Sequence, residues 1–224
     1  MSPPLIKASM IRAELGYLAD QIGRLEAGGI DALHFDVEDD GDNQTILIGP
    51  AFIRGLRKYT KLPFDVHVRF GQPDRSVDQF LDAGADCLML QLEMCVAPEV
   101  ALSHIRDRGC RAGLAIYPDT AATALASLLD LCDEINVMTV APGRPGRLIE
   151  KGVDSVRAVT DMVTDRGLKL LVQADGAVSM ETRDVLVRAG AAALIAGYPI
   201  FSRADFGAAI AELRHGVPDI SLLR

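Results

Sequence analysis

The sequence predicts an α/β fold, a closed (β/α)8 TIM barrel that forms a single domain over residues 1–224. Short apolar segments rich in Val, Ile, Leu and Ala alternate along the whole chain with longer segments of helical periodicity, which is typical of βα units. Eight such units can be recognised, and eight is the number that closes a barrel of this type. A doubly wound open sheet shares the same local pattern and is the alternative fold.

The eight predicted strands are short runs dominated by apolar residues. They are LIKAS (5–9), ALHFDV (32–37), FDVHVR (64–69), CLMLQL (87–92), AGLAIY (112–117), INVMTV (135–140), KLLVQA (169–174) and ALIAG (193–197). Helices are expected near residues 12–27, 50–59, 74–83, 97–108, 120–130, 151–166, 180–189 and 203–213. Each predicted strand is therefore followed by its own helix.

Three of the predicted helix-to-strand junctions resemble one another. They read LEAGGIDALHF, LDAGADCLML and VRAGAAALIA. Each contains a glycine placed to end a helix in the left-handed conformation before an apolar strand begins. The repeated junction supports a repeated βα unit, and no linker or low-complexity stretch divides the chain.

Composition and charge limit the partners that we expect. Hydrophobic residues make up 49% of the chain and charged residues 24%, which is ordinary for a globular protein. The formal net charge of −8 disfavours a nucleic-acid partner, because phosphate backbones are bound by clustered Lys and Arg. No apolar run approaches the roughly 18 to 20 residues that a membrane span needs. A small-molecule ligand is therefore favoured.

Cysteine usage indicates the compartment. Cys87, Cys95, Cys110 and Cys132 form no close CxxC pair. The N-terminal stretch MSPPLIKASMIRAELG lacks the long apolar segment of a secretory signal. We therefore expect reduced thiols in a cytoplasmic enzyme.

Polar side chains stand where predicted strands end, and in a (β/α)8 barrel this face carries the active site. His34 and Asp36 end the second strand at i, i+2 spacing, so both project to one face. His67 ends the third strand, beside them if sequential strands are neighbours, and Asp175 follows the seventh strand. Two imidazoles and two carboxylates predict a divalent-metal site suited to zinc, manganese, iron or cobalt.

The four residues also indicate a type of reaction. A metal that binds a carbonyl and a neighbouring hydroxyl stabilises an enediolate, while Asp36 and Asp175 on opposite faces of a sugar can remove and return a proton. Taken singly, such a histidine is more often a hydrogen-bonded core residue and such an aspartate a cap or turn residue. The coincidence of four favours the metal site. The aspartates beyond the strand, Asp39, Asp40 and Asp42, are expected to form a solvated turn.

Motifs around these residues extend along nearly the whole chain. In order they are ASMIRAELGYL, HFDVEDDG, ILIGP, LPFDVHV, AGADCLML, INVMTVAPG, ADGAV and ALIAGYPIF. In kind, order and spacing they resemble the ribulose-phosphate 3-epimerase family, metal-dependent (β/α)8 enzymes that interconvert ribulose 5-phosphate and xylulose 5-phosphate. The resemblance implies that His34, Asp36, His67 and Asp175 are metal ligands and that Asp36 and Asp175 are the acid-base pair. By the same analogy a homo-oligomer is expected.

The resemblance also assigns residues to the substrate. Ser9 matches a first-strand serine near the substrate, and Met138 matches one of three methionines that cover the reacting enediolate. Glu38 and Arg69 replace the other two methionines. The pair either forms a salt bridge that substitutes for apolar packing or binds a polar group of the substrate. Glu38 has the inward phase of Asp36 if the second strand continues to it.

The phosphate-binding elements of the family are altered in this chain. A glycine run after the sixth strand is replaced by PGRPGRLI, which adds two arginines, and Gln91 and Tyr117 replace a histidine and an asparagine. The residues expected to contact this end of the substrate are Gly143, Arg144, Gly146, Arg147, Gly176, Gly197 and Tyr198. Either the arginines take over phosphate recognition, or the substrate ends in a different group such as a carboxylate or a neutral hydroxyl.

Three functions are consistent with these residues. The leading hypothesis is a metal-dependent epimerase of a sugar or sugar phosphate. A synthase or decarboxylase from the same barrel superfamily would need a lysine between aspartates, and HFDVEDD contains none. A non-catalytic barrel that binds a sugar is the third hypothesis, which the four intact ligand positions disfavour.

Overall fold

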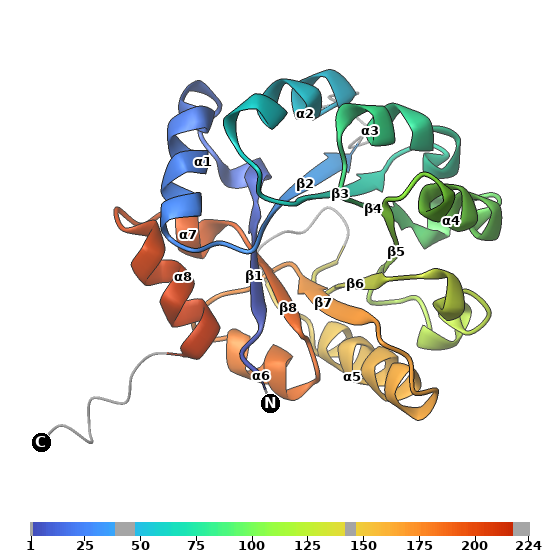
Figure 1. The fold of residues 1–224 in the computed structure, drawn as a ribbon. Helices are drawn as coiled ribbons and strands as arrows, with labels where there is room; N and C mark the ends of the chain where they lie inside the picture. Colours follow the sequence, from blue (N-terminus) through green and yellow to red (C-terminus); the bar gives the residue numbers. More distant parts are fainter. Residues whose placement is uncertain (1, 39–47, 142–146, 217–224) are drawn as a thin grey trace, which may run out of the picture.

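The eight strands close into a parallel barrel, in the order β1 to β8, with β8 paired to β1 (Figure 1). A computed structural model describes residues 2–38, 48–141 and 147–216. The predicted fold class is confirmed, and the open sheet is excluded. The strands are β1 (Leu5–Ser9), β2 (Ala32–Glu38), β3 (Phe64–Arg69), β4 (Cys87–Gln91), β5 (Arg111–Ile116), β6 (Glu134–Met138), β7 (Leu171–Asp175) and β8 (Ala193–Ala196).

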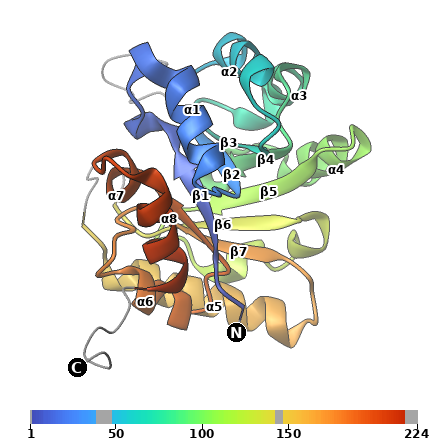
Figure 2. The ribbon, with the colours of Figure 1, turned by 60° about the vertical axis from the view of Figure 1, so that its left-hand side comes forward.

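Helices surround the barrel (Figure 1). They are α1 (Leu18–Ala27), α2 (Pro50–Leu56), α3 (Val77–Ala83), α4 (Pro98–Asp107), α5 (Glu150–Asp165), α6 (Arg183–Arg188), α7 (Tyr198–Phe201) and α8 (Phe206–His215). Figure 2 shows α1 and α8 side by side against the outside of β1. None of the helices described is both long enough and apolar enough to cross a bilayer. The four cysteines are free thiols.

The helix predicted over 120–130 was wrong. This segment forms two short 3-10 helices, η6 (Ala122–Leu125) and η7 (Leu129–Leu131). Leu125, Leu128 and Leu129 are buried, and their spacing produced the helical periodicity. Because 3-10 turns also bring residues i and i+3 onto one side, the same spacing fits either structure. Similarly, α1 begins at Leu18, after two 3-10 turns, and not near residue 12.

Alternation along the strands divides the molecule into an apolar layer and a polar interior. On β2, Leu33, Phe35 and Val37 face the helices and belong to the hydrophobic core, whereas His34 and Asp36 face inward. The buried polar residues supplied by strands inside the barrel include Lys7, His34, Asp65, His67, Gln91, Glu134, Asn136, Gln173 and Asp175. Buried polar groups need partners, so this interior is expected to be organised by hydrogen bonds.

Gly152 allows α5 to approach the sixth strand closely. A Cβ built on Gly152 would lie 2.7 Å from Cα of Thr139, which follows β6. Gly152→Ala is expected to destabilise the protein by about 1–3 kcal/mol, because the added methyl group would meet backbone atoms that cannot move away as a flexible side chain can. The matched control is Gly23→Ala on the exposed side of α1, where a Cβ meets nothing within 4 Å. This control is expected to stabilise by up to about 1 kcal/mol. Urea unfolding measures both changes, and equal effects would contradict the packing argument.

Candidate active site

The four predicted metal ligands converge inside the barrel from three strands, although His34 lies in the first half of its strand and not at its end. His34 and Asp36 lie on β2, His67 on β3 and Asp175 at the end of β7. Asp36 is the register partner of His67 across the β2–β3 pair. The ligand atoms of the four side chains all lie within 4.8 Å of one another. The structure thus brings together residues that are 141 positions apart in the chain.

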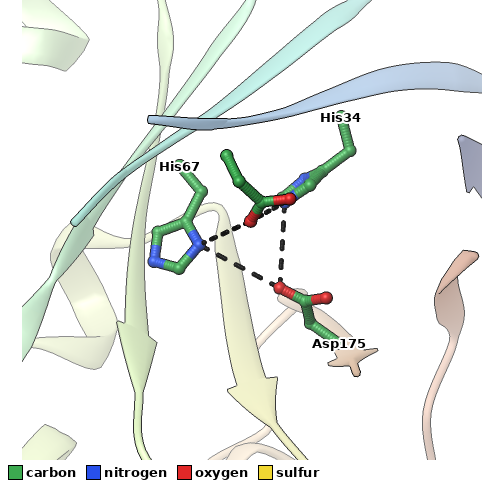
Figure 3. A group of neighbouring side chains, drawn as sticks. His34, His67 and Asp175 are labelled. Carbon is green, nitrogen blue, oxygen red and sulfur yellow. Dashed lines mark hydrogen bonds and ion pairs between the residues drawn. The ribbon is translucent and has the colours of Figure 1, made fainter. Parts of the chain in front are cut away.

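Ring nitrogens and carboxylate oxygens of this cluster face one another (Figure 3). His34 Nε2 lies 3.2 Å from Asp36 Oδ1 and 3.8 Å from Asp175 Oδ2. His67 Nδ1 lies 3.5 Å from Asp36 Oδ1 and 4.0 Å from Asp175 Oδ2. Atoms bound to one ion at about 2.0–2.2 Å are separated by roughly 3–4 Å, so these spacings fit a single ion.

Gln91 sets the orientation of His67. The Gln91 side chain donates from Nε2 to Glu93 Oε2 over 2.6 Å, which directs its Oε1 toward His67. His67 Nε2 lies 2.8 Å from this oxygen and therefore carries the proton. Nδ1 of His67 is then left with a free lone pair that faces the carboxylates. Gln91, which departs from the family pattern, still performs this orienting contact.

Asp65 sets the orientation of His34 in the same way. Its Oδ2 lies 3.1 Å from His34 Nδ1 at the middle of the barrel. As a carboxylate, Asp65 accepts the Nδ1 proton, so Nε2 of His34 faces Asp36 with its lone pair. The sequence analysis missed Asp65 because it lies inside the apolar third strand; its i, i+2 spacing to His67 was the available signal.

Two observations show that these residues fit a cation. His67 Nδ1 is buried and has no hydrogen-bond partner within the described segments, which is costly unless an ion or another ligand occupies the position. Burial by itself lowers the pKa of His34, but Asp36 and Asp65 more than offset it and raise that pKa well above its ordinary value. The carboxylates therefore favour positive charge here. Mixed imidazole and carboxylate ligands suit divalent transition metals.

The environments of the two carboxyl groups, which the sequence predicts to be the acid-base pair, shift their pKa values in opposite directions. Burial would raise the pKa of Asp36, but His34 and His67 overcome this effect and hold it well below its ordinary value. Burial and the neighbouring charge of Asp36 raise the pKa of Asp175 above its ordinary value. Such opposite shifts are typical of an acid paired with a base.

Neighbouring groups hold both carboxylates in place. Ser9 Oγ donates to Asp36 Oδ2 over 3.1 Å, which leaves Oδ1 of Asp36 facing the histidines. Asn136 Nδ2 donates to Asp175 Oδ2 over 3.1 Å. Thr139 donates its backbone N–H to the Asp175 carbonyl over 2.7 Å, so the strand end itself is tied to β6. The two carboxylates are therefore held in fixed orientations before any ligand binds.

A cavity of about 330 Å³ opens above the cluster. Asp36 and Asp175 lie in its lining, together with Met138 and other apolar residues from the strand ends. The volume is of the size that holds a small metabolite. The cavity brings a bound molecule into contact with both carboxyl groups.

Comparison with known proteins agrees with this geometry. The sequence profile described as "Ribulose-phosphate 3 epimerase family" matches residues 5–201. The chain belongs to this family. The ribulose-phosphate 3-epimerase of Bacillus subtilis is 34% identical over 211 residues, which cover 93% of this chain and 97% of that protein. The chloroplastic ribulose-5-phosphate-3-epimerase of Arabidopsis thaliana is 30% identical over 213 residues, 94% of this chain and 76% of that protein.

Solved structures support the fold alone. The structure of 3-hexulose-6-phosphate synthase superimposes with a TM-score of 0.69 at 15% identity, covering 95% of this chain and 99% of that chain. The structure of KGPDC from Streptococcus mutans gives a TM-score of 0.71 at 14% identity, covering 96% and 97%. These similarities confirm the (β/α)8 barrel that the ribulose-phosphate 3-epimerase family shares with other enzymes.

The structure places most of the predicted substrate residues around the cavity of this family member. Its lining includes Ser9, Glu38, Arg69, Met138, Gly176, Gly197 and Tyr198. Arg147 is exposed and is not among the lining residues. Gly143, Arg144 and Gly146 lie outside the described residues, as do Asp39, Asp40 and Asp42. Contact of any of these residues with substrate stays a prediction.

Glu38 and Arg69 form an ion pair at the rim of the cavity. Strand β2 continues to Glu38, so its side chain has the inward phase of Asp36, and Arg69 is its register partner on β3. Both side chains line the cavity and remain partly exposed. The pair therefore adds a polar contact to the cavity lining, and whether a substrate group binds to it stays a prediction.

Arg12 is a cavity residue that the sequence analysis missed. It ends the 3-10 helix η1 (Met10–Arg12), three residues after Ser9. Its side chain lies against Gly197, where a Cβ would be 2.7 Å from Arg12 Cγ. Of the two cations in the cavity lining, Arg69 is paired with Glu38, whereas Arg12 has no carboxylate partner in the described part of the chain. Its position in the first turn after the end of a predicted strand was the available signal.

Proposed function

We propose that this protein is a metal-dependent 3-epimerase of a ketose phosphate, interconverting ribulose 5-phosphate and xylulose 5-phosphate or a close analogue. The observation that carries the proposal is the pair of carboxyl groups, Asp36 and Asp175, which approach one cavity from different strands with opposite pKa shifts. Family membership and the names of the relatives support the same reaction.

The proposed reaction inverts one carbon next to a carbonyl. Asp36, held ionised by His34 and His67, removes the proton from one face of the substrate. Asp175, whose pKa is raised by burial and by the charge of Asp36, delivers a proton to the opposite face. In the reverse direction the two residues exchange roles. The apolar lining, which includes Met138, keeps water from competing for these protons.

The residues that would hold the metal are His34, Asp36, His67 and Asp175. A divalent zinc, manganese, iron or cobalt ion there would supply Lewis-acid stabilisation of the negative charge that develops on the substrate's oxygens. Gln91 and Asp65 keep the lone pairs of the two histidines directed at this position. We further propose that the enzyme acts in the cytoplasm as a homo-oligomer, in line with the family.

Proton exchange tests the proposed reaction. Pentuloses, tetruloses and hexuloses, each with and without phosphate, are incubated in D2O with the protein and with Zn, Mn, Fe or Co. The expected result is deuterium incorporation and inversion at C3 of a phosphorylated ketulose, followed by NMR. If no ketose exchanges with any metal, the epimerase proposal fails and a sugar-binding barrel takes its place. Exchange confined to unphosphorylated or carboxylated sugars would reassign the substrate.

Arg12 is proposed to bind the anionic end of the substrate. Its guanidinium matches the geometry of a phosphate or a carboxylate. Arg12→Gln is expected to raise KM for a ketose phosphate by about 10- to 100-fold at nearly unchanged kcat, since a hydrogen bond to a charged group contributes about 1.5–3 kcal/mol. Steady-state kinetics with and without the phosphate measure the effect. The control is Arg157→Gln, at an exposed arginine on α5, and Arg147→Gln is measured beside it as the competing candidate. A larger effect of Arg147→Gln than of Arg12→Gln would assign the anion to Arg147.

A further inference from the structure

A lysine is buried inside the barrel beneath the metal cluster. Lys7 on β1 is 2% exposed, and the mechanism described above does not use it. Its Nζ lies 2.7 Å from Asp65 Oδ2 and 2.6 Å from Glu134 Oε2, and both carboxylates are almost fully buried. Burial by itself would lower the pKa of Lys7, but the two carboxylates more than offset it and raise that pKa, so the ammonium group is charged.

These groups form a continuous chain from the surface to a metal ligand. Arg111, whose side chain is 46% exposed, forms an ion pair with Glu134. Glu134 accepts a hydrogen bond from Lys7, and Lys7 donates to the same Asp65 oxygen that faces His34 Nδ1. Four strands supply the groups from Arg111 to Asp65, namely β5, β6, β1 and β3.

We propose that Lys7 is a positioning residue for the metal centre, which holds Asp65 in the orientation that makes His34 present Nε2 to the ion. Asp65 Oδ1 is buried without a hydrogen-bond partner in the described structure, so only contacts to Oδ2 align this carboxylate. Within the described residues these contacts come from Lys7 and His34. Without Lys7, no other side chain of the described residues besides His34 itself anchors the Asp65 carboxylate.

Stability alone does not account for the charged interior. Removing several charges from water is costly, and apolar residues of similar volume often stabilise a protein as well or better. Surrounding strands of the barrel already supply an extensive apolar layer. This charged network contacts His34 through Asp65. It is therefore better explained by the fixed orientation that groups behind the metal ligands give to those ligands.

Metal affinity tests this inference, which rests on the metal centre of the proposed function. Co²⁺ is titrated into the full-length protein and followed by visible absorption and by competition with a chelator. Lys7→Met is expected to weaken Co²⁺ binding by about 10- to 100-fold. Arg111→Met is the matched control, because it removes the outer cation of the same chain without touching Asp65. Its Co²⁺ affinity is expected to stay within about two-fold of wild type.

A second variant covers the case in which Lys7→Met does not fold. Lys7→Met/Glu134→Leu removes the buried pair together, so no uncompensated glutamate remains beside Asp65, and an intact barrel is expected. The same loss of Co²⁺ affinity supports the positioning role, and wild-type affinity in this folded double variant overturns it. A Tm change without an affinity change also overturns it. Wild-type protein that binds Co²⁺ but exchanges no ketose proton would instead refute only the proposed reaction.

Discussion

Asp175→Asn is expected to lower the rate of epimerisation by at least about 10³-fold. An amide can neither deliver nor accept the proton, and acid-base groups typically contribute about 10²–10⁴-fold, to which the loss of a proposed metal ligand is added. NMR in D2O, started separately from each epimer, measures inversion and exchange.

A comparison of deuterium exchange between the two starting epimers shows which carboxyl group acts on which face. With Asp36 as the remaining base, any residual deuterium exchange is confined to the epimer whose proton faces Asp36, and no inversion follows. Asp36→Asn is expected to show the opposite preference. The control is Asp161→Asn, which changes an exposed aspartate on α5 and should leave both rates unchanged. Inversion by Asp175→Asn at more than about a tenth of the wild-type rate would remove Asp175 from the acid-base pair.

His67→Ala is expected to weaken divalent-metal binding by at least about 100-fold and to lower kcat/KM by about 10³-fold or more, because one of the four proposed ligands is lost from a buried site. Metal content after dialysis against a weak chelator, measured by mass spectrometry, reports binding independently of turnover. His104→Ala is the control, since His104 lies on α4 and pairs with Asp78 at the surface. Full metal retention by His67→Ala would show that the ion is held elsewhere.

The strand ends were predictable because two simple rules act on them. Inward and outward side chains alternate along β2, and barrels place function at the carboxyl ends of strands, so the shared inward placement of His34 and Asp36 could be predicted from spacing alone. His67 followed from the neighbouring strand. Asp175 could be predicted from its place at the end of β7, although only closure of the barrel brings it close to the other predicted ligands.

Other features depend on contacts that spacing does not encode. Lys7 lies within a predicted strand and Glu134 directly before one, and only the closed barrel, in whose interior the two side chains meet, reveals that they pair. Arg12 lies in a 3-10 turn whose direction is set by its contact with Gly197. Spacing alone can also give the wrong element. In the segment over 120–130, buried leucines at i and i+3 fit an α-helix and 3-10 turns equally well.

Closure of the barrel between β1 and β8 has a consequence for biosynthesis. Leu5 to Ala8 on β1 pair with Ala193 to Ala196 on β8. One edge of β1 therefore stays without its hydrogen-bond partners until β8 has been synthesised. The binding site is likewise incomplete until Asp175 has been added. Unpaired parallel edges and sequence-distant contacts slow folding and invite association with other chains. Nascent chains that stop before β8 are therefore expected to depend on chaperones, and metal to be captured only at the end of synthesis.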